Sequence, residues 1–240
     1  MLDAVYSEHP SALPGAVVWT LTLDPSAQQN RILPDGCMDL IWSDGRLLVA
    51  GPDTSAQVVE RTDGSSVTGL RFAPGFAPSV LGVPGHVLRD LRVDLDALWA
   101  AHEVARLTDL VEAAPDRGAA LERVALERLA GVTATASWTG GAVQQLISGA
   151  SVAAVAQSIG YSERQLHRRS LDAFGYGLNT LARVLRMTRG LDLARAGGPL
   201  ASVAVAAGYA DQPHFARDVK SLAGVSVTEL LGDQAEVTGS

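Results

Sequence analysis

The sequence predicts an α+β protein with a β-rich first part, connecting helices and an all-α last part. Short runs of β-forming residues, punctuated by Gly and Pro, lie between residues 15 and 95. After about residue 94, apolar residues recur at helical spacing. The last third holds two copies of one pattern, at residues 152–175 and 201–224, in which a small apolar helix precedes a polar one. Together these observations give the predicted order of strands, helices and a paired helical unit.

The strand-forming runs are rich in Val, Leu, Ile, Thr and aromatic residues and end at turn-forming residues. They are residues 17–23, 38–42, 46–50 and 67–72. Short strands at this spacing are typical of a small barrel or sandwich, and we expect a small β-barrel.

Helical periodicity follows at residues 95–110 and 121–129, and Asp116 is placed to cap the second helix. Residues 131–141 are small and polar, which is typical of a linker. We therefore divide the chain into a β domain (1–95), a helical connector or dimerisation region (96–135) and a helical domain (136–240).

The two copies in the last third share a Gly-Tyr pair that recurs after 48 residues, at Gly160 and Gly208. Glycine allows the positive φ that a sharp turn between helices requires. Ser162 with Gln165 forms a capping-box pattern, and Asp211 is the corresponding cap in the second copy. Such paired helices are typical of helix-turn-helix motifs, whose second helix enters the major groove of DNA.

The second helix of each unit presents long hydrogen-bond donors. Arg suits guanine and Gln suits adenine when such donors lie in the first turns of the helix. The candidate DNA-binding residues are Ser162, Arg164, Gln165, His167 and Arg168 in unit one and Gln212, His214 and Arg217 in unit two. We expect Leu166, Leu171 and Phe174 to face inward. For any one of the polar residues, a merely solvated helix face remains the alternative.

Charge and composition narrow the function classes. The net charge is −7, but residues 1–135 carry 10 basic and 18 acidic residues, whereas residues 136–240 carry 9 and 8. The acidic excess therefore belongs to the first part.

The single cysteine, Cys37, excludes an intramolecular disulfide and fits a reducing cytoplasm. The five histidines are scattered and no apolar run approaches the ~20 residues of a membrane span, so we expect no metal, no cofactor and no membrane partner.

Motifs in the last part allow a family comparison. They are Ile-Gly-Tyr-Ser at 159–162, Leu-His-Arg at 166–168, Phe-Gly at 174–175, Ala-Gly-Tyr at 207–209 and His-Phe-Ala-Arg at 214–217. With these motifs, residues 140–231 resemble the DNA-binding domain of the AraC/XylS family of bacterial transcription regulators. Ser170 departs from the pattern, because the family usually has an apolar residue there. The resemblance implies two subdomains held rigidly by one long helix, residues 178–196, with their second helices about 10 bp apart on the DNA.

Residues 31–42, 49–54 and 69–75 resemble the cupin-like domain that precedes such DNA-binding domains. The mouth of a small barrel is a natural ligand site. The candidate ligand-binding residues are Asp35, Cys37, Asp39, Trp42 and Arg71. Each also has a structural interpretation: a Pro-Asp-Gly turn for Asp35, an ion pair for Asp39 with Arg71, and burial for Trp42 and Cys37.

Together the residues and the resemblance predict a cytoplasmic, non-enzymatic, sequence-specific DNA-binding transcription regulator, controlled by a small molecule in its N-terminal domain. The expected partners are double-stranded DNA, a small-molecule effector, RNA polymerase and a second copy of the chain in a homodimer. An activator role follows from the resemblance alone, since the residues do not distinguish activation from repression. Two alternatives stay open: a ligand-independent dimeric regulator, and an enzyme whose helical region is an interaction module.

Overall fold

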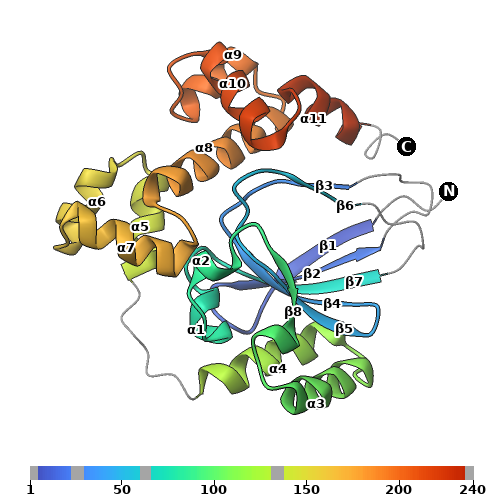
Figure 1. Ribbon diagram of the computed structural model, residues 1–240. Coiled ribbons are helices and arrows are strands. Elements are labelled where there is room, and N and C mark those ends of the chain that lie inside the picture. The colour runs from blue at the N-terminus through green and yellow to red at the C-terminus, as the bar shows by residue number, and fades with distance from the viewer. Residues whose placement is uncertain (1–4, 23–29, 60–65, 131–137, 236–240) are drawn as a thin grey trace.

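The computed structural model describes residues 5–22, 30–59, 66–130 and 138–235. Figure 1 shows an N-terminal part (residues 5–130) built around a sheet and an all-helical C-terminal part (residues 138–235) that lies along one side of it. The predicted α+β class is confirmed.

A six-stranded antiparallel sheet with strand order β1-β2-β7-β4-β5-β8 forms the centre of the N-terminal part. Its strands are β1 (Val5–Pro10), β2 (Ala16–Thr22), β4 (Met38–Ser43), β5 (Arg46–Ala50), β7 (Ser66–Phe72) and β8 (Arg92–Asp94). Strands β3 (Asn30–Ile32) and β6 (Gln57–Val59) pair separately as a short ribbon. A closed barrel needs its edge strands to pair, but β1 and β8 remain the two edges of this sheet. The prediction of a closed barrel is therefore not confirmed, because the sheet is open.

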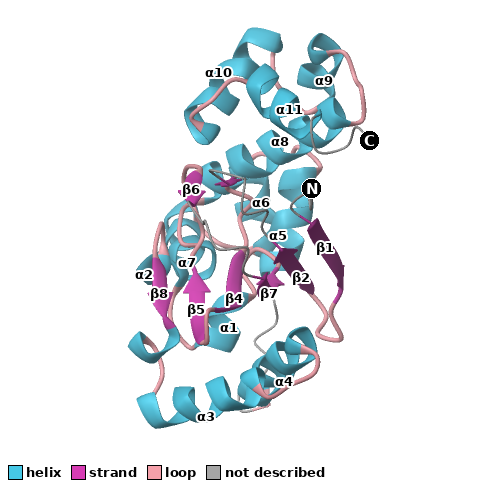
Figure 2. Cartoon of the chain, turned by 90° about the vertical axis from the view of Figure 1, so that its right-hand side faces the viewer, coloured by secondary structure: helices cyan, strands magenta, loops and turns pink. Residues whose placement is uncertain are grey.

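Helices cover one face of the sheet (Figure 2). The helices α3 (Ala101–Glu112) and α4 (Arg117–Leu129) pack against the side chains of alternate strand residues, among them Leu40, Trp42 and Leu70. Asp116 caps α4 by accepting a hydrogen bond from the backbone N–H of Ala119 at 3.0 Å, as predicted. Because strand residues alternate between faces, Asp39 and Arg71 lie on the opposite face from Leu40 and Leu70.

Short helical segments that the sequence did not suggest follow β7. They are α1 (Ala77–Leu81) and α2 (Gly85–Leu88). They place a compact corner of the N-terminal part beside the C-terminal helices. The helix predicted over residues 95–110 instead begins as the 3₁₀ helix η1 (Leu95–Ala97), which precedes α3.

The C-terminal part contains α5 (Trp138–Ile147), α6 (Val152–Ile159), α7 (Glu163–Phe174), α8 (Leu178–Arg195), α9 (Leu200–Ala206), α10 (Gln212–Ala223) and α11 (Val227–Ala235). It has two hydrophobic clusters, one formed by α5–α7 with the start of α8 and one by the end of α8 with α9–α11. Of the predicted linker, residues 131–137 lie outside the described residues, and residues 138–141 are already helical. That part of the linker prediction is wrong, because Trp138, Ala142 and Val143 pack into the first cluster.

The predicted turns and caps of both units are confirmed. Gly160 has φ +77° and Gly208 has φ +90°. The capping box of Ser162 and Gln165 is complete, and Asp211 accepts a hydrogen bond from the N–H of His214 at 2.7 Å. These local patterns thus set where α7 and α10 begin.

The inward face of α7 differs from the prediction at one position. Leu166 and Phe174 are buried, but Ser170 is fully buried between them while Leu171 is only half-buried. The Ser170 hydroxyl donates to the backbone oxygen of Leu166 at 2.7 Å, so its polarity is satisfied inside the helix. This internal bond lets a serine occupy a core position where the family usually has an apolar residue.

Candidate nucleic-acid interface

The helices α7 and α10 have the same length and the same caps. Each has 12 residues, begins after a side-chain cap (Ser162 or Asp211) and ends at a glycine in the left-handed conformation (Gly175 or Gly224). Aligned from cap to cap, they place Arg168 of α7 and Arg217 of α10 at equivalent positions. The two helices are therefore geometric equivalents.

The predicted residues of unit one gather on the exposed side of α7. Ser162, Arg164, Gln165, His167 and Arg168 are all exposed. The Gln165 side-chain oxygen accepts from the N–H and the hydroxyl of Ser162, at 3.0 and 2.9 Å, which leaves its amide nitrogen available as a donor. The His167 ring lies against the turn that follows α7, since a Cβ built on Gly177 would be 2.9 Å from His167 Nδ1.

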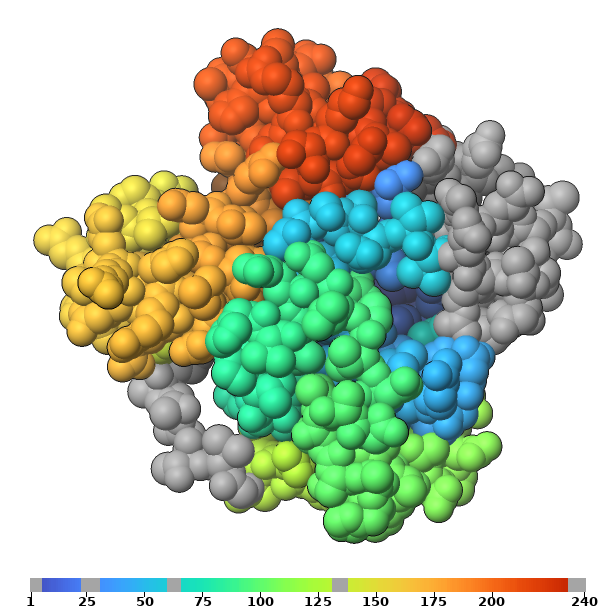
Figure 3. All heavy atoms as spheres, in the orientation of Figure 1, coloured from blue at the N-terminus to red at the C-terminus, as the bar shows by residue number. Residues whose placement is uncertain are grey.

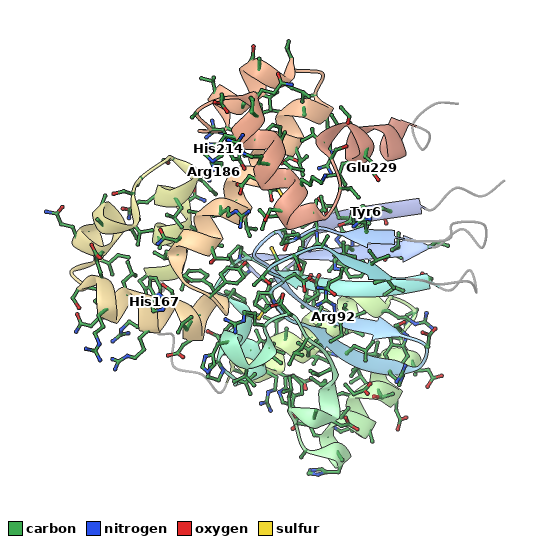
Figure 4. All side chains as sticks on the ribbon, turned by 45° about the horizontal axis from the view of Figure 1, so that its top comes forward. Tyr6, Arg92, His167, Arg186, His214 and Glu229 are labelled. Carbon is green, nitrogen blue, oxygen red and sulfur yellow. The ribbon has the colours of Figure 1, made fainter. Side chains whose placement is uncertain are left out.

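In unit two, Gln212 and Arg217 are exposed, whereas His214 is half-buried. The His214 ring meets the Tyr209 ring edge-on, with 5.1 Å between the ring centroids. Figure 4 shows His167 and His214 on their separate helices. Packing thus constrains both histidines, while the arginines extend freely.

Four of the five candidate ligand residues come together on the sheet face that α3 and α4 leave uncovered. Arg71 Nε lies 3.3 Å from Asp39 and 3.5 Å from Asp35, and Asp35 accepts from the N–H of Cys37 at 2.8 Å. Trp42 does not join them, because its side chain lies in the core on the other face. We call Asp35, Cys37, Asp39 and Arg71 the Arg71 cluster.

The electrostatics of the Arg71 cluster follow from burial. Burial raises the pKa of Asp39 to about 6, although the Arg71 charge opposes that shift. Burial, and next the charge of Asp35, raise the pKa of the Cys37 thiol, which disfavours the reactive thiolate. Arg71 stays cationic, since the two carboxylates more than offset its burial and raise its pKa.

Sequence reasoning missed three aromatic residues around this cluster. Trp19 Nε1 donates to Asp39 at 2.6 Å, and Tyr6 stacks on Trp19 with 6.5 Å between the ring centroids. Tyr176, in the turn between α7 and α8, has a buried hydroxyl without a hydrogen-bond partner, and the charge of Asp35 contributes to its raised pKa after burial. No sequence signal links Tyr176 to the sheet, since the two lie far apart along the chain. Figure 4 shows Tyr6 and Arg92 on the sheet.

Among the described residues there is no group of three or more His, Cys, Asp or Glu side chains that could hold a metal ion. No helix in the described part of the chain is long and apolar enough to cross a membrane.

Comparisons with known proteins address the two parts separately. Residues 155–232 match a family described as a helix-turn-helix domain, and residues 16–94 match a domain of unknown function (DUF6597). The C-terminal part is an AraC-type helix-turn-helix domain. AraC-type domains are associated with DNA-binding regulators of transcription, which are not enzymes. No curated protein sequence matches the chain.

Solved structures of ToxT from Vibrio cholerae are similar to this chain. A crystal structure of an apo ToxT variant has 11% sequence identity and a TM-score of 0.49, covering 93% of this chain and 99% of that chain. A ToxT structure bound to an unsaturated fatty acid has 13% identity and a TM-score of 0.46, covering 96% and 97%.

A buried carboxylate connects α8 to α10 within the AraC-type domain. Asp218 contacts the Arg183 guanidinium, lies 3.6 Å from Arg186 Nη2 and accepts from the Tyr209 hydroxyl at 3.0 Å. The Arg186 guanidinium also stacks over the Tyr209 ring at 4.5 Å. This network was not predicted, because an acidic residue on a helix is usually solvated. The available signal was its position between Phe215, Val219 and Leu222, which form the inward face of α10.

Proposed function

We propose that the protein is a sequence-specific transcription regulator that reads two neighbouring major-groove segments with α7 and α10. The observation that carries the proposal is the equivalence of these helices, each capped at its start and each with an exposed arginine at the same position, Arg168 or Arg217. Their exposed donors suit base edges and phosphates.

The position along each helix suggests the role of each side chain. Arg164, Gln165 and Gln212 lie in the first turn, where side chains reach base edges. Arg168 and Arg217 lie farther along, where phosphate contacts are more common. His167 and His214 pack against the turns and would orient the neighbouring donors.

Selection of bound sequences from a random DNA pool tests this proposal. Once an operator is defined, Arg164→Ala should weaken binding to it by about 1–3 kcal/mol and relax the sequence preference. Arg217→Ala should weaken binding about equally for all sequences and reduce its salt dependence. Neither substitution should unfold the protein. Arg46→Ala is the matched control, because Arg46 forms an exposed ion pair with Asp94 on the sheet, outside α7, α10 and the proposed dimer contact. Unchanged footprints for both helix variants would remove these residues from the interface.

We also propose that a small-molecule effector binds at the Arg71 cluster. The cluster lies on the sheet face opposite α3 and α4, and it adjoins the C-terminal part, since a Cβ built on Gly36, between Asp35 and Cys37, would lie 2.9 Å from Leu181 Cδ1. An effector there would contact both parts, and differential affinity for two arrangements would shift their balance. Thermal shift against candidate metabolites tests this, with Arg71→Lys expected to reduce the shift and Arg46→Lys expected to leave it unchanged. A shift that Arg71→Lys leaves intact would place the effector elsewhere, and no shift with any metabolite would favour a ligand-independent regulator.

Finally, we propose the division into residues 1–95, 96–135 and 136–240, with α3 and α4 forming the contact of a homodimer. Leu126 on α4 is the position at which to test this contact, because it is an apolar residue that is 44% exposed. Leu126→Glu should shift the sedimentation of the chain towards the monomer, and an unchanged profile would place the contact elsewhere.

A further inference from the structure

The N-terminal part contacts the C-terminal end of α7. The helix α2 packs there so closely that a Cβ built on Gly85 would lie 2.7 Å from the backbone nitrogen of Gly175. Likewise, a Cβ on Gly175 would lie 2.5 Å from Pro52 Cγ. Beside this backbone contact, His86 Nδ1 lies 3.3 Å from the Asp172 carboxylate in the last turn of α7.

The N-terminal part also contacts the C-terminal end of α10. The backbone N–H of Ala56 donates to the oxygen of Leu222 at 2.7 Å, and Arg31 Nη1 donates to the oxygen of Ala223 at 2.9 Å. The last carbonyls of a helix have no partner within it and carry partial negative charge, so a guanidinium stabilises them. Figure 3 shows the cyan and green surface of the N-terminal part in contact with the orange and red surface of the C-terminal part.

These contacts matter because the two units proposed to read DNA have few other packing interactions in common. Their hydrophobic clusters are separate, and α8 is the helix that contributes to both. The contacts of the N-terminal part at Gly175 and at Leu222–Ala223 form a second connection between α7 and α10.

The contacts leave the proposed DNA-reading faces open. They involve the last turn of each helix, whereas Arg164, Gln165 and Gln212 in the first turns are exposed. The N-terminal part therefore holds the two helices in place without covering the side chains proposed to touch DNA.

We infer that the N-terminal part determines which operator spacing the protein prefers, by holding α7 and α10 at a set separation and rotation. Arg31 and Gly85 act as positioning residues for this specificity. The inference rests on the proposed function, since it assumes that both helices read DNA.

Operator spacing is a sensitive readout of this arrangement. Adding one base pair between two recognised segments moves the second by about 3.4 Å and rotates it by about 35°. A rigid pair of helices cannot follow that change without losing contacts, so the wild-type chain should lose about tenfold or more in affinity. A pair held by α8 alone could follow it at lower cost.

The experiment uses the full chain and operators obtained from the random pool, with the two segments separated by one base pair less, the original number, and one or two more. Arg31→Ala removes the donor to α10, and Gly85→Ala pushes α2 away from Gly175. Their controls are Arg46→Ala, which removes an exposed guanidinium elsewhere on the sheet, and Gly140→Ala, whose added Cβ would meet nothing within 4 Å. We expect the two test variants to bind all spacings within about threefold of one another, and the controls to keep the wild-type preference.

The possible outcomes distinguish failure of this inference from failure of the proposed DNA-binding function. Test variants that keep the wild-type spacing profile would overturn the inference, because α8 alone would then set the arrangement. If the wild-type chain enriched no sequence from the pool, the proposed function itself would fail. If the melting curve shows that Gly85→Ala is unfolded, the spacing profile of Arg31→Ala alone tests the inference, because that substitution removes an exposed guanidinium without steric conflict.

Discussion

Replacement of Asp218 tests whether the buried network between α8 and α10 stabilises the C-terminal part. The Asp218 side chain is 8% exposed, whereas those of Arg183 and Arg186 are 38% and 33% exposed. In Asp218→Ala both arginines can recover hydration from solvent. The Tyr209 hydroxyl cannot, because Tyr209 is buried and Asp218 is its acceptor.

The magnitude follows from these two losses. A hydrogen bond to a charged group contributes about 1.5–3 kcal/mol, and an orphaned buried hydroxyl costs about 1–3 kcal/mol. Partial rehydration of the arginines reduces the total, so we expect Asp218→Ala to lower the free energy of unfolding by about 3 kcal/mol. Asp218→Asn keeps an acceptor for Tyr209 and should lose about half as much.

Calorimetry on the full chain measures the effect. If the 240-residue chain unfolds in one transition, about 3 kcal/mol corresponds to a fall in Tm of roughly 6–12 °C. Asp192→Ala is the control, because the Asp192 side chain is 64% exposed and its pair with Arg195 lies on the surface. A loss below about 1 kcal/mol for Asp218→Ala would refute the assignment of a stabilising network.

Three further predictions concern single substitutions. Burial raises the pKa of Asp39 from 3.8 to about 6, so its contribution to the free energy of unfolding is fully present below pH 4 and is lost as the pH rises through 6. Wild-type stability in denaturant unfolding should therefore fall by roughly 3 kcal/mol across that pH range, and Asp39→Asn should remove this fall. The same dependence of stability on pH in Asp39→Asn would contradict the shift. Ser162→Ala removes the cap of α7 and should lower stability by about 1 kcal/mol in thermal melts, whereas the exposed Ser202→Ala should not; equal melting temperatures would show that the cap is dispensable. Gly69→Ala should destabilise the sheet by about 1–3 kcal/mol, because its Cβ would lie 2.3 Å from the Trp19 indole; a neutral melting curve would mean that Trp19 moves freely aside.

Sequence reasoning succeeded where a structure depends on neighbouring residues. The capping box at Ser162, the cap at Asp211 and the turns at Gly160 and Gly208 are all confirmed, because each involves residues only a few positions apart. The starts of α7 and α10 therefore followed from the sequence.

It failed where the outcome depends on distant parts of the chain. Whether β1 pairs with β8 depends on the curvature of the whole sheet, and the predicted barrel is not confirmed. Asp218 was overlooked because its partners on α8 are distant in the sequence, with Arg183 35 residues away. An ion pair of Asp39 with Arg71 was considered from the sequence, but Asp35 was interpreted as a turn residue and its approach to Arg71 was not predicted.

The backbone contact between Gly85 and Gly175 limits how freely this protein could be recombined with others. A chimera that grafts the helical residues onto a foreign sensor would preserve α8 and both caps. It would still lack a surface able to approach Gly175 without side chains, as well as donors for the terminal carbonyls of α10. The two parts look like separable domains in the sequence, but their contact surfaces fit one another. A designed chimera would therefore have to carry over both contact surfaces together.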